Sequence, residues 1–191
     1  MSPADQGLPP WRPLLKHARL KEGHSPMGRW LQLASIGPDG SPRVRTLVFR
    51  GWWNHNSLEL LTDGRSAKQQ ELQRDPRFEL CWLLPKAQSQ FRLRGHQYHL
   101  DRDERMQRQR HHWLGLQPEA RALWGWPPPG QELDSAGDWP TAIPNGTTMP
   151  DSFALLRLEI THVDLLELTQ SPHRRRCWSA ENGWKEVALN P

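Results

Sequence analysis

The stretch RVRTLVFRGWWNHNSLELLTDGRSAK, residues 43–68, determines the fold that we expect for this chain. It contains two β-type runs, residues 43–50 and residues 58–62, which are joined by a polar turn. A helix should begin at Ser66, because residues 66–69 have the Ser-x-x-Gln form of a capping box. The stretch therefore predicts a β-hairpin that leads directly into a helix.

The start of this helix is suited to an anion. A helix N-terminus presents unpaired backbone N–H groups and a partial positive charge. Lys68 lies in the first turn, where the helix dipole disfavours a cation unless an anion is present. In a hairpin, Arg45 comes near the helix start. We therefore predict a phosphate-sized site formed by Arg45, Thr62, Ser66 and Lys68. The alternative is that the arginines are solvated edge-strand charges and that Ser66 only caps the helix.

Apolar runs on either side of the hairpin predict further antiparallel strands. They lie at residues 29–36, 78–84 and 90–100, and a helix at residues 10–22 precedes them. A barrel is favoured, because closure removes the exposed edges of an open sheet. A Rossmann fold would need crossover helices and a glycine fingerprint, and the sequence shows neither. We expect a mainly β chain with peripheral helices.

The second half of the chain combines helices, a long loop and strands. Helices are expected at residues 101–113 and 118–124. Strands are expected at residues 153–168 and 184–189, and residues 174–176 should open a further strand between them. The strand at 153–168 changes phase near Thr161, as a bulge would produce. Residues 131–150 have no apolar period, so we expect a long loop that acts as a lid or a dimer arm.

The composition indicates a single domain over residues 1–191, with residues 1–9 disordered. The hydrophobic fraction is only 36%, but 11 Trp residues supply large apolar areas, part of which we expect at a subunit contact. The net charge of +4 suits an anionic small ligand as well as it suits nucleic acid. No run is long enough to span a membrane and no apolar signal region opens the chain, so we expect a cytoplasmic protein.

Cysteine and histidine spacing predicts no metal site. Cys81 and Cys177 are far apart, which argues against a zinc ribbon or a disulfide scaffold, and Cys81 is expected in the core. His111 and His112 are adjacent, so they point in different directions on a helix and make a poor metal pair.

The arginine-rich helix at residues 101–113 could follow a nucleic-acid backbone and use tryptophans for stacking. Its acidic residues come first and its basic residues last, which the helix dipole alone would favour. The helix belongs to no recognisable RNA-binding motif. We therefore favour a solvated helix face, and nucleic-acid binding is not expected.

The order of these motifs resembles one known family. RTLVFR (residues 45–50), followed by LT (61–62) and S-x-K (66–68), is similar to the flavin mononucleotide (FMN) site of the pyridoxamine 5'-phosphate oxidase-like family of FMN-binding split barrels. The similarity continues through DPR (75–77) and SQFRLRG (89–95), and it covers nearly the whole chain, including PEARALWGWPPPG and GWKEVALNP. It implies an antiparallel split β-barrel of the FMN-binding type, assembled as a homodimer with the flavin at the subunit interface.

The resemblance assigns roles to matching residues. It implies that Arg45 and Lys68 hold the FMN phosphate and that Gln90 contacts the flavin. The cofactor-binding residues that it implies are Arg45, Thr46, Leu47, Val48, Phe49, Arg50, Leu61, Thr62, Ser66, Lys68, Gln90 and Arg175. The candidates that face the substrate are Arg50, Arg121 and His173.

The sequence also departs from the family. Trp113, Gln117 and Arg121 stand where the oxidase grips its substrate's phosphate with Tyr, Arg and Ser. Ser171 replaces a second substrate arginine, and Ala67 replaces an arginine before the helix lysine. Because Gln cannot imitate a bidentate arginine, these departures argue against true vitamin B6 oxidase activity, although Arg121 could partly compensate.

These features support an FMN-dependent oxidoreductase with a small-molecule substrate, in which the flavin performs the redox chemistry. The alternative is a non-catalytic protein that binds or senses flavin or haem, with His96, His99 or His173 as conceivable haem ligands.

Overall fold

Eight strands and four α-helices make up the computed structural model, which describes residues 7–191. The strands are β1 (Trp30–Ile36), β2 (Pro42–Trp52), β3 (Ser57–Asp63), β4 (Arg77–Leu84), β5 (Ser89–Tyr98), β6 (Phe153–Glu167), β7 (Arg174–Ser179) and β8 (Val187–Leu189). The helices are α1 (Trp11–Lys21), α2 (Ala67–Arg74), α3 (Arg102–Gly115) and α4 (Pro118–Arg121), with 3-10 turns at Pro26–Gly28, Ala122–Gly125 and Ala180–Asn182. Disorder was expected at residues 1–9. Residues 1–6 of this segment lie outside the described residues.

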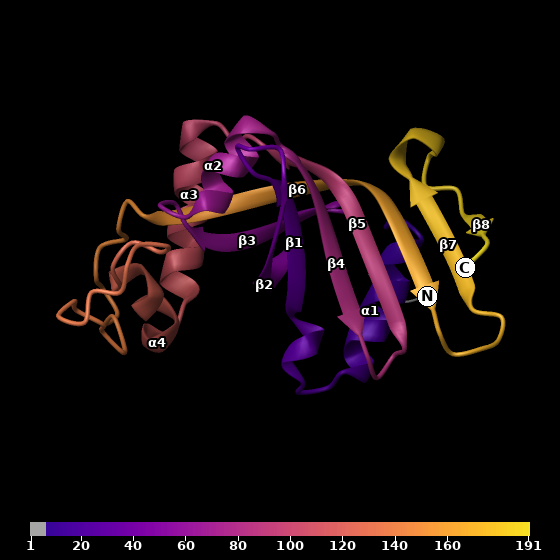
Figure 1. Cartoon of the computed structure of the whole chain (residues 1–191), viewed down its shortest axis with the longest axis horizontal. Coiled ribbons are helices and arrows are strands. Elements are labelled where there is room, and N and C mark those ends of the chain that lie inside the picture. Colours follow the sequence, from indigo (N-terminus) through magenta and orange to yellow (C-terminus); the bar gives the residue numbers. More distant parts are fainter. Residues whose placement is uncertain (1–6) are drawn as a thin grey trace.

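The strands form one antiparallel sheet in the order β3-β2-β1-β4-β5-β6-β7-β8, and β3 also pairs with β6. This second pairing closes the first six strands into a barrel, and β7 and β8 extend the sheet beyond β6 (Figure 1). The helices lie around the barrel. The expected fold, a mainly β antiparallel barrel with peripheral helices, is confirmed.

The barrel core follows the alternation of side chains along each strand. In β4, Phe78, Leu80, Trp82 and Leu84 point inward and are buried, which places Cys81 on the outer face. The prediction that Cys81 lies in the core was therefore wrong. It is half-buried on the outer face of the sheet, because an apolar strand at this position still alternates between two faces.

Helix α1 covers one end of the barrel. Its buried residues Trp11, Leu15 and Ala18 belong to the same hydrophobic core as the strands. The Trp11 ring also contacts Trp52 and Trp184, so the N-terminal helix, β2 and the C-terminal segment meet at one aromatic cluster. Among the described helices, none combines the length and the apolar content that crossing a bilayer requires.

A bulge in β6 confirms the predicted change of phase. Arg94 pairs with His162, whereas the next residue, Gly95, pairs with Ile160, so Thr161 is the extra residue. Gly95 is required here because the two backbones approach closely. A Cβ atom built on Gly95 would lie 1.8 Å from the carbonyl oxygen of Glu159.

We expect the substitution Gly95→Ala to lower the free energy of unfolding by about 3 kcal/mol, because β5 and β6 must separate to admit the methyl group. Urea titration monitored by circular dichroism measures the change. Gly115→Ala, at a helical glycine with open space around its Cβ position, is the control and should leave stability unchanged or raise it by up to about 1 kcal/mol. Equal stability of the two variants would contradict the prediction.

The segment between α3 and β6 packs over the outer face of β3. Trp113, Leu116, Trp124 and Phe153 form a second hydrophobic cluster there, with Leu61 of β3 packed against it. Residues 131–150 contain no helix or strand. The first part of this loop lines a cavity on the outside of the barrel.

Candidate functional site

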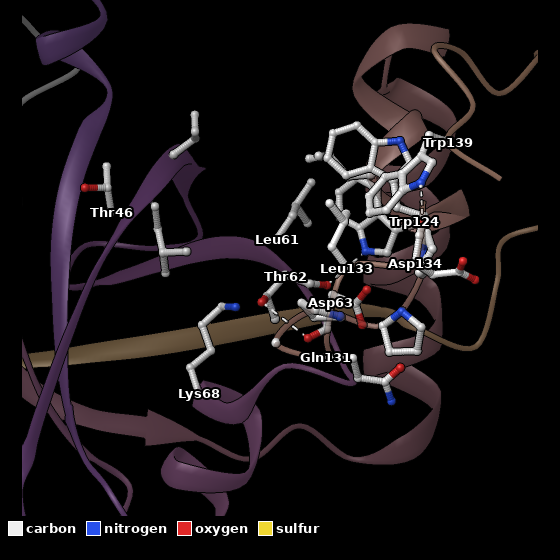
Figure 2. A pocket seen from close by; sticks show the side chains of 18 of the residues that line it. Thr46, Leu61, Thr62, Asp63, Lys68, Trp124, Gln131, Leu133, Asp134 and Trp139 are labelled. Carbon is white, nitrogen blue, oxygen red and sulfur yellow. Dashed lines mark hydrogen bonds between the residues drawn. The ribbon is translucent and has the colours of Figure 1, made fainter. Parts of the chain in front are cut away.

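A cavity of about 490 Å³ lies between the outer side of the β2–β3 hairpin and residues 123–139. We call residues 126–139 the strap. Figure 2 shows Thr46 and Lys68 on one side of the opening and Leu133, Asp134 and Trp139 of the strap on the other. The cavity is lined by Thr46, Leu47, Val48, Arg50, Leu61, Thr62, Asp63, Lys68, Leu123, Trp124 and Trp126 to Asp134, together with Trp139. Its size is within the range of small-molecule sites.

Strand β2 contributes to the cavity mainly through its outward-facing residues, whereas Leu47 lies on the inward face and also packs against the barrel core. Of the run predicted to follow the flavin, Thr46, Leu47, Val48 and Arg50 line the cavity. Phe49 does not, because its side chain is buried in the barrel core. The β2–β3 hairpin thus forms one wall of the predicted site, and its paired strands make this wall rigid.

Lys68 lies in the first turn of α2. Its Nζ donates a hydrogen bond to Ser66 Oγ over 2.8 Å. Burial, followed by repulsion from Arg45, lowers the pKa of Lys68, although Asp63 and Glu71 act in the opposite direction. A bound anion would relieve this repulsion. The prediction of an anion site at the helix start therefore fits the local charges.

Arg45 lies behind Lys68 and does not line the cavity. Its Nη2 is 2.6 Å from Oε2 of the buried Glu71, and it also donates to Ser35 Oγ. Of the two cations predicted to hold the phosphate, only Lys68 therefore lines the cavity. The other, Arg45, is already paired to the carboxylate of Glu71.

The capping box predicted at residues 66–69 was wrong. Ser66 precedes α2 as its N-cap, but its hydroxyl donates to the carbonyl oxygen of Asp63 over 2.6 Å and caps no helix N–H. Thr62 Oγ1 lies 3.4 Å from Ser66 Oγ, so both hydroxyls belong to the same polar cluster as Lys68. The open amides at the start of α2 remain available to a ligand.

Gln90 and Arg175 lie far from this cavity in the same chain. Both are on the outer face of the sheet, where Gln90 pairs with Leu166 and Leu166 pairs with Arg175. By the shorter path around the closed barrel, through β3 and β6, Arg175 on β7 is separated from β2 by three strand spacings, or roughly 14 Å, and it does not line the cavity. It forms an ion pair with Asp164 at 2.8 Å. Within one chain, Gln90 and Arg175 therefore do not meet the other residues that were predicted to bind FMN.

Of the three residues predicted to face the substrate, only Arg50 lines the cavity. Arg121 is buried, and its guanidinium donates to Asn145 and to the carbonyl oxygens of Trp113, Leu114 and Pro144. His173 is exposed and its Nδ1 contacts the Gln170 carbonyl oxygen. The structure thus gives Arg121 a structural role that sequence reasoning did not foresee.

The sequence predicted that the loop at residues 131–150 is a lid or a dimer arm, and part of that loop does line the cavity, but the individual strap residues that line it were not predicted. The cavity is lined from irregular backbone by Trp126, Leu133 and Trp139. Because this backbone forms no helix or strand, no periodic sequence pattern predicts that these three side chains face the same cavity. Two glycines allow the close packing behind them. A Cβ atom on Gly125 would lie 2.8 Å from Pro140, and one on Gly137 would lie 3.1 Å from Pro127.

A buried ionic cluster fixes α3 to the barrel. Glu59 of β3 is 2% exposed, and its carboxylate lies 2.7 Å from both Arg108 and His112 of α3 and 2.8 Å from Arg157 of β6. The guanidinium carbons of Arg108 and Arg157 lie 4.4 and 4.0 Å from the centre of the Trp53 ring. Arg108 is therefore already paired within the chain. The same contacts hold α3 in the position from which the chain continues to the strap side of the cavity.

This cluster makes stability depend on pH. Burial raises the pKa of Glu59, but the hydrogen bonds from His112, Arg108 and Arg157 outweigh it and lower the pKa from 4.5 to about 2. A carboxyl with a lowered folded pKa stabilises the fold fully above its unfolded pKa. That contribution should be lost as the pH falls from about 4.5 to about 2.

We expect Glu59→Gln to lower the free energy of unfolding at pH 7 by about 3 kcal/mol, because the buried Arg157 and the half-buried Arg108 lose their carboxylate. The variant should also show a smaller loss of stability than the wild type between pH 4.5 and pH 2. Urea titrations at several pH values measure both effects. Glu119→Gln, at an exposed carboxylate of α4, is the control, and identical pH profiles for wild type and Glu59→Gln would refute the assignment.

Comparison with known proteins adds independent evidence. Residues 8–101 match the family described as pyridoxamine 5'-phosphate oxidase, FMN-binding domain. A protein from Arabidopsis thaliana named pyridoxine/pyridoxamine 5'-phosphate oxidase 2 is 30% identical over 189 residues, which cover 90% of this chain and 95% of that protein. The match therefore extends well beyond the first hundred residues.

Solved structures show the same fold. A pyridoxamine 5'-phosphate oxidase-related, FMN-binding protein from Nostoc punctiforme is 33% identical and superimposes with a TM-score of 0.86, over 97% of this chain and 99% of the other. PhzG from Burkholderia lata, solved with tetrahydrophenazine-1-carboxylic acid, superimposes with a TM-score of 0.78 over 100% and 98% of the two chains. It is only 18% identical, so it speaks for the fold alone.

Proposed function

Because the chain belongs to the pyridoxamine 5'-phosphate oxidase-like family of FMN-binding proteins, we propose that it binds FMN in the cavity beside β2 and acts as an FMN-dependent oxidoreductase on a small molecule. The observation that carries the proposal is the position of Lys68. It lies at the start of a helix, lines the cavity and is repelled by Arg45, which is the environment that a phosphate dianion would neutralise.

The other residues of this side fit the rest of the cofactor. Lys68, the open amides of α2 and the hydroxyl of Thr62 would hold the phosphate, with Arg45 as a supporting charge, while Ser66 accepts a hydrogen bond from Lys68 and so orients it. The outward-facing side chains of Thr46 and Val48, with the backbone between them, offer an extended β surface for the ring. When bound, FMN supplies an acceptor for electrons from the substrate, and the chain binds and orients both molecules.

We expect the double variant Arg45→Ala/Lys68→Ala to weaken FMN binding at least tenfold, since the direct charge-assisted contact of Lys68 is worth roughly 1.5–3 kcal/mol and the supporting charge of Arg45 is lost as well. Calorimetric titration of apoprotein with FMN measures the affinity. Adding Glu71→Gln to the variant avoids a stranded buried carboxylate, and circular dichroism checks the fold. Arg74→Ala, at the far end of α2, is the control. FMN affinity equal to that of the wild type in the double variant would disprove this phosphate site.

We also propose that two copies assemble through the outer face of the sheet. The face includes the exposed side chains of Trp30, Leu83, Val187 and Leu189, which are 40–45% exposed. Register places it on the same side as Val48, which pairs with Trp30, so it is continuous with the cavity. A two-fold arrangement would let Gln90 and Arg175 of each copy reach the cavity of the other, which they do not reach in their own chain.

This assembly predicts that Leu83→Arg produces a monomer, because a buried unpaired charge would oppose the contact. Light scattering should give a mass near twice the 22.2 kDa of one chain for the wild type and near that of one chain for the variant. FMN affinity should fall in parallel. Leu20→Arg, at an exposed leucine of α1, is the control and should remain dimeric. A wild type that is monomeric with FMN bound would contradict the proposal.

The flavin proposal is favoured over the haem alternative by the lining of the cavity. None of the described residues that line it is a histidine, a cysteine, a methionine or a tyrosine, the side chains that usually hold haem iron. His96 contacts Glu159 on the outer sheet, and His173 lies before β7. A flavin spectrum of the purified protein would support the proposal, and a Soret band would contradict it.

A further inference from the structure

The strap side of the cavity is built from indole rings whose donors are already used. The Nε1–H groups of Trp124, Trp126 and Trp139 donate to the carbonyl oxygens of Thr62, Pro140 and Asp134, over 3.0, 2.9 and 3.3 Å. These bonds fix the orientation of each ring. What the rings can offer a ligand is therefore their apolar and π surface, which attracts cations as well as apolar groups.

Two carboxylates accompany these rings. Glu132 and Asp134 both line the cavity from the strap. Asp134 Oδ1 accepts a hydrogen bond from the backbone N–H of Ala136 over 2.9 Å, but within residues 7–191 neither carboxylate forms an ion pair. The third carboxylate of the lining, Asp63, differs from them because Arg65 pairs with it at 2.6 Å. The strap thus adds uncompensated negative charge to its side of the cavity.

The cations of the cavity come from other elements. Lys68 belongs to α2 and Arg50 to β2, and neither comes from the strap. Figure 2 shows Lys68 across the opening from Asp134 and Trp139. With a phosphate dianion held at Lys68, the potential in the remaining space would become still more negative. The two sides of the cavity therefore suit groups of opposite charge.

We propose that the strap side is a subsite for an organic cation, the positively charged, apolar end of a substrate that carries a protonated or quaternary amine. This inference rests on the proposed function, because it assigns the opposite side to FMN. The indole surfaces take up the apolar groups around the nitrogen, and Glu132 and Asp134 balance its charge. A phosphorylated group would meet two carboxylates here and no free basic side chain from the strap.

Three probes with one ring and three charges test the subsite. Benzyltrimethylammonium, benzyl alcohol and benzoate are titrated into the FMN-loaded protein, and binding is followed by calorimetry and by the absorbance of the flavin. We expect the cation to bind at least tenfold more tightly than the alcohol and benzoate to bind most weakly. Equal affinity for the cation and the alcohol would overturn the inference.

Variants identify the groups responsible. Glu132→Gln/Asp134→Asn should reduce the preference for the cation over the alcohol to about twofold or less. The new amide oxygen at position 134 can still accept the hydrogen bond from the Ala136 N–H, so the strap should keep its fold. Trp139→Leu should weaken binding of the cation several-fold. The control Glu119→Gln/Asp151→Asn removes two exposed carboxylates outside the cavity and should keep the full preference. Loss of the preference in the control, or its retention in the strap variant, would overturn the assignment.

A separate titration distinguishes this inference from the flavin proposal. FMN is first titrated into each apoprotein, and the strap variant should bind it as tightly as the wild type does. A wild type that fails to bind FMN would overturn the proposed function. A protein that binds FMN normally and shows no preference for the cation would overturn the subsite alone.

Discussion

The antiparallel pairing of β3 with β6 is the interaction on which the rest of the structure depends. It closes the barrel, and its register sets Glu59 opposite Arg157. The ionic cluster around these two side chains then fixes α3, and α3 leads into the segment that crosses β3. The cavity therefore exists because a strand near residue 60 and a strand near residue 157 pair in one particular alignment.

The cavity joins two kinds of backbone. Its β2 and α2 side is held by ladder and helix hydrogen bonds, which suits a cofactor that must be kept in one position. Its strap side is irregular, and its order comes from side-chain donors bonded to backbone carbonyls, as in Trp126 and Trp139. Proteins of one fold commonly differ in such loops, and so the same barrel can serve different substrates.

Much of the fold could be predicted because periodicity and turns are local signals. The strands around residues 43–62, the helix at α2 and the bulge at Thr161 were confirmed. The capping box failed because the hydroxyl of Ser66 had a competing acceptor in Asp63, which only the folded turn supplies. The buried role of Arg121 and the direction of the strap depend on contacts between distant segments, which no local pattern encodes.

The distance along the chain between the two closing strands also matters while the protein is being made. About 90 residues separate the end of β3 from the start of β6. At typical rates of about 5–20 residues per second, a ribosome needs roughly 5 to 20 s to synthesise them. Until then Leu58 and Leu60 lie on an unpaired edge, where a nascent chain is exposed to aggregation. The architecture that builds the cavity thus makes the unfinished chain a natural client for chaperones.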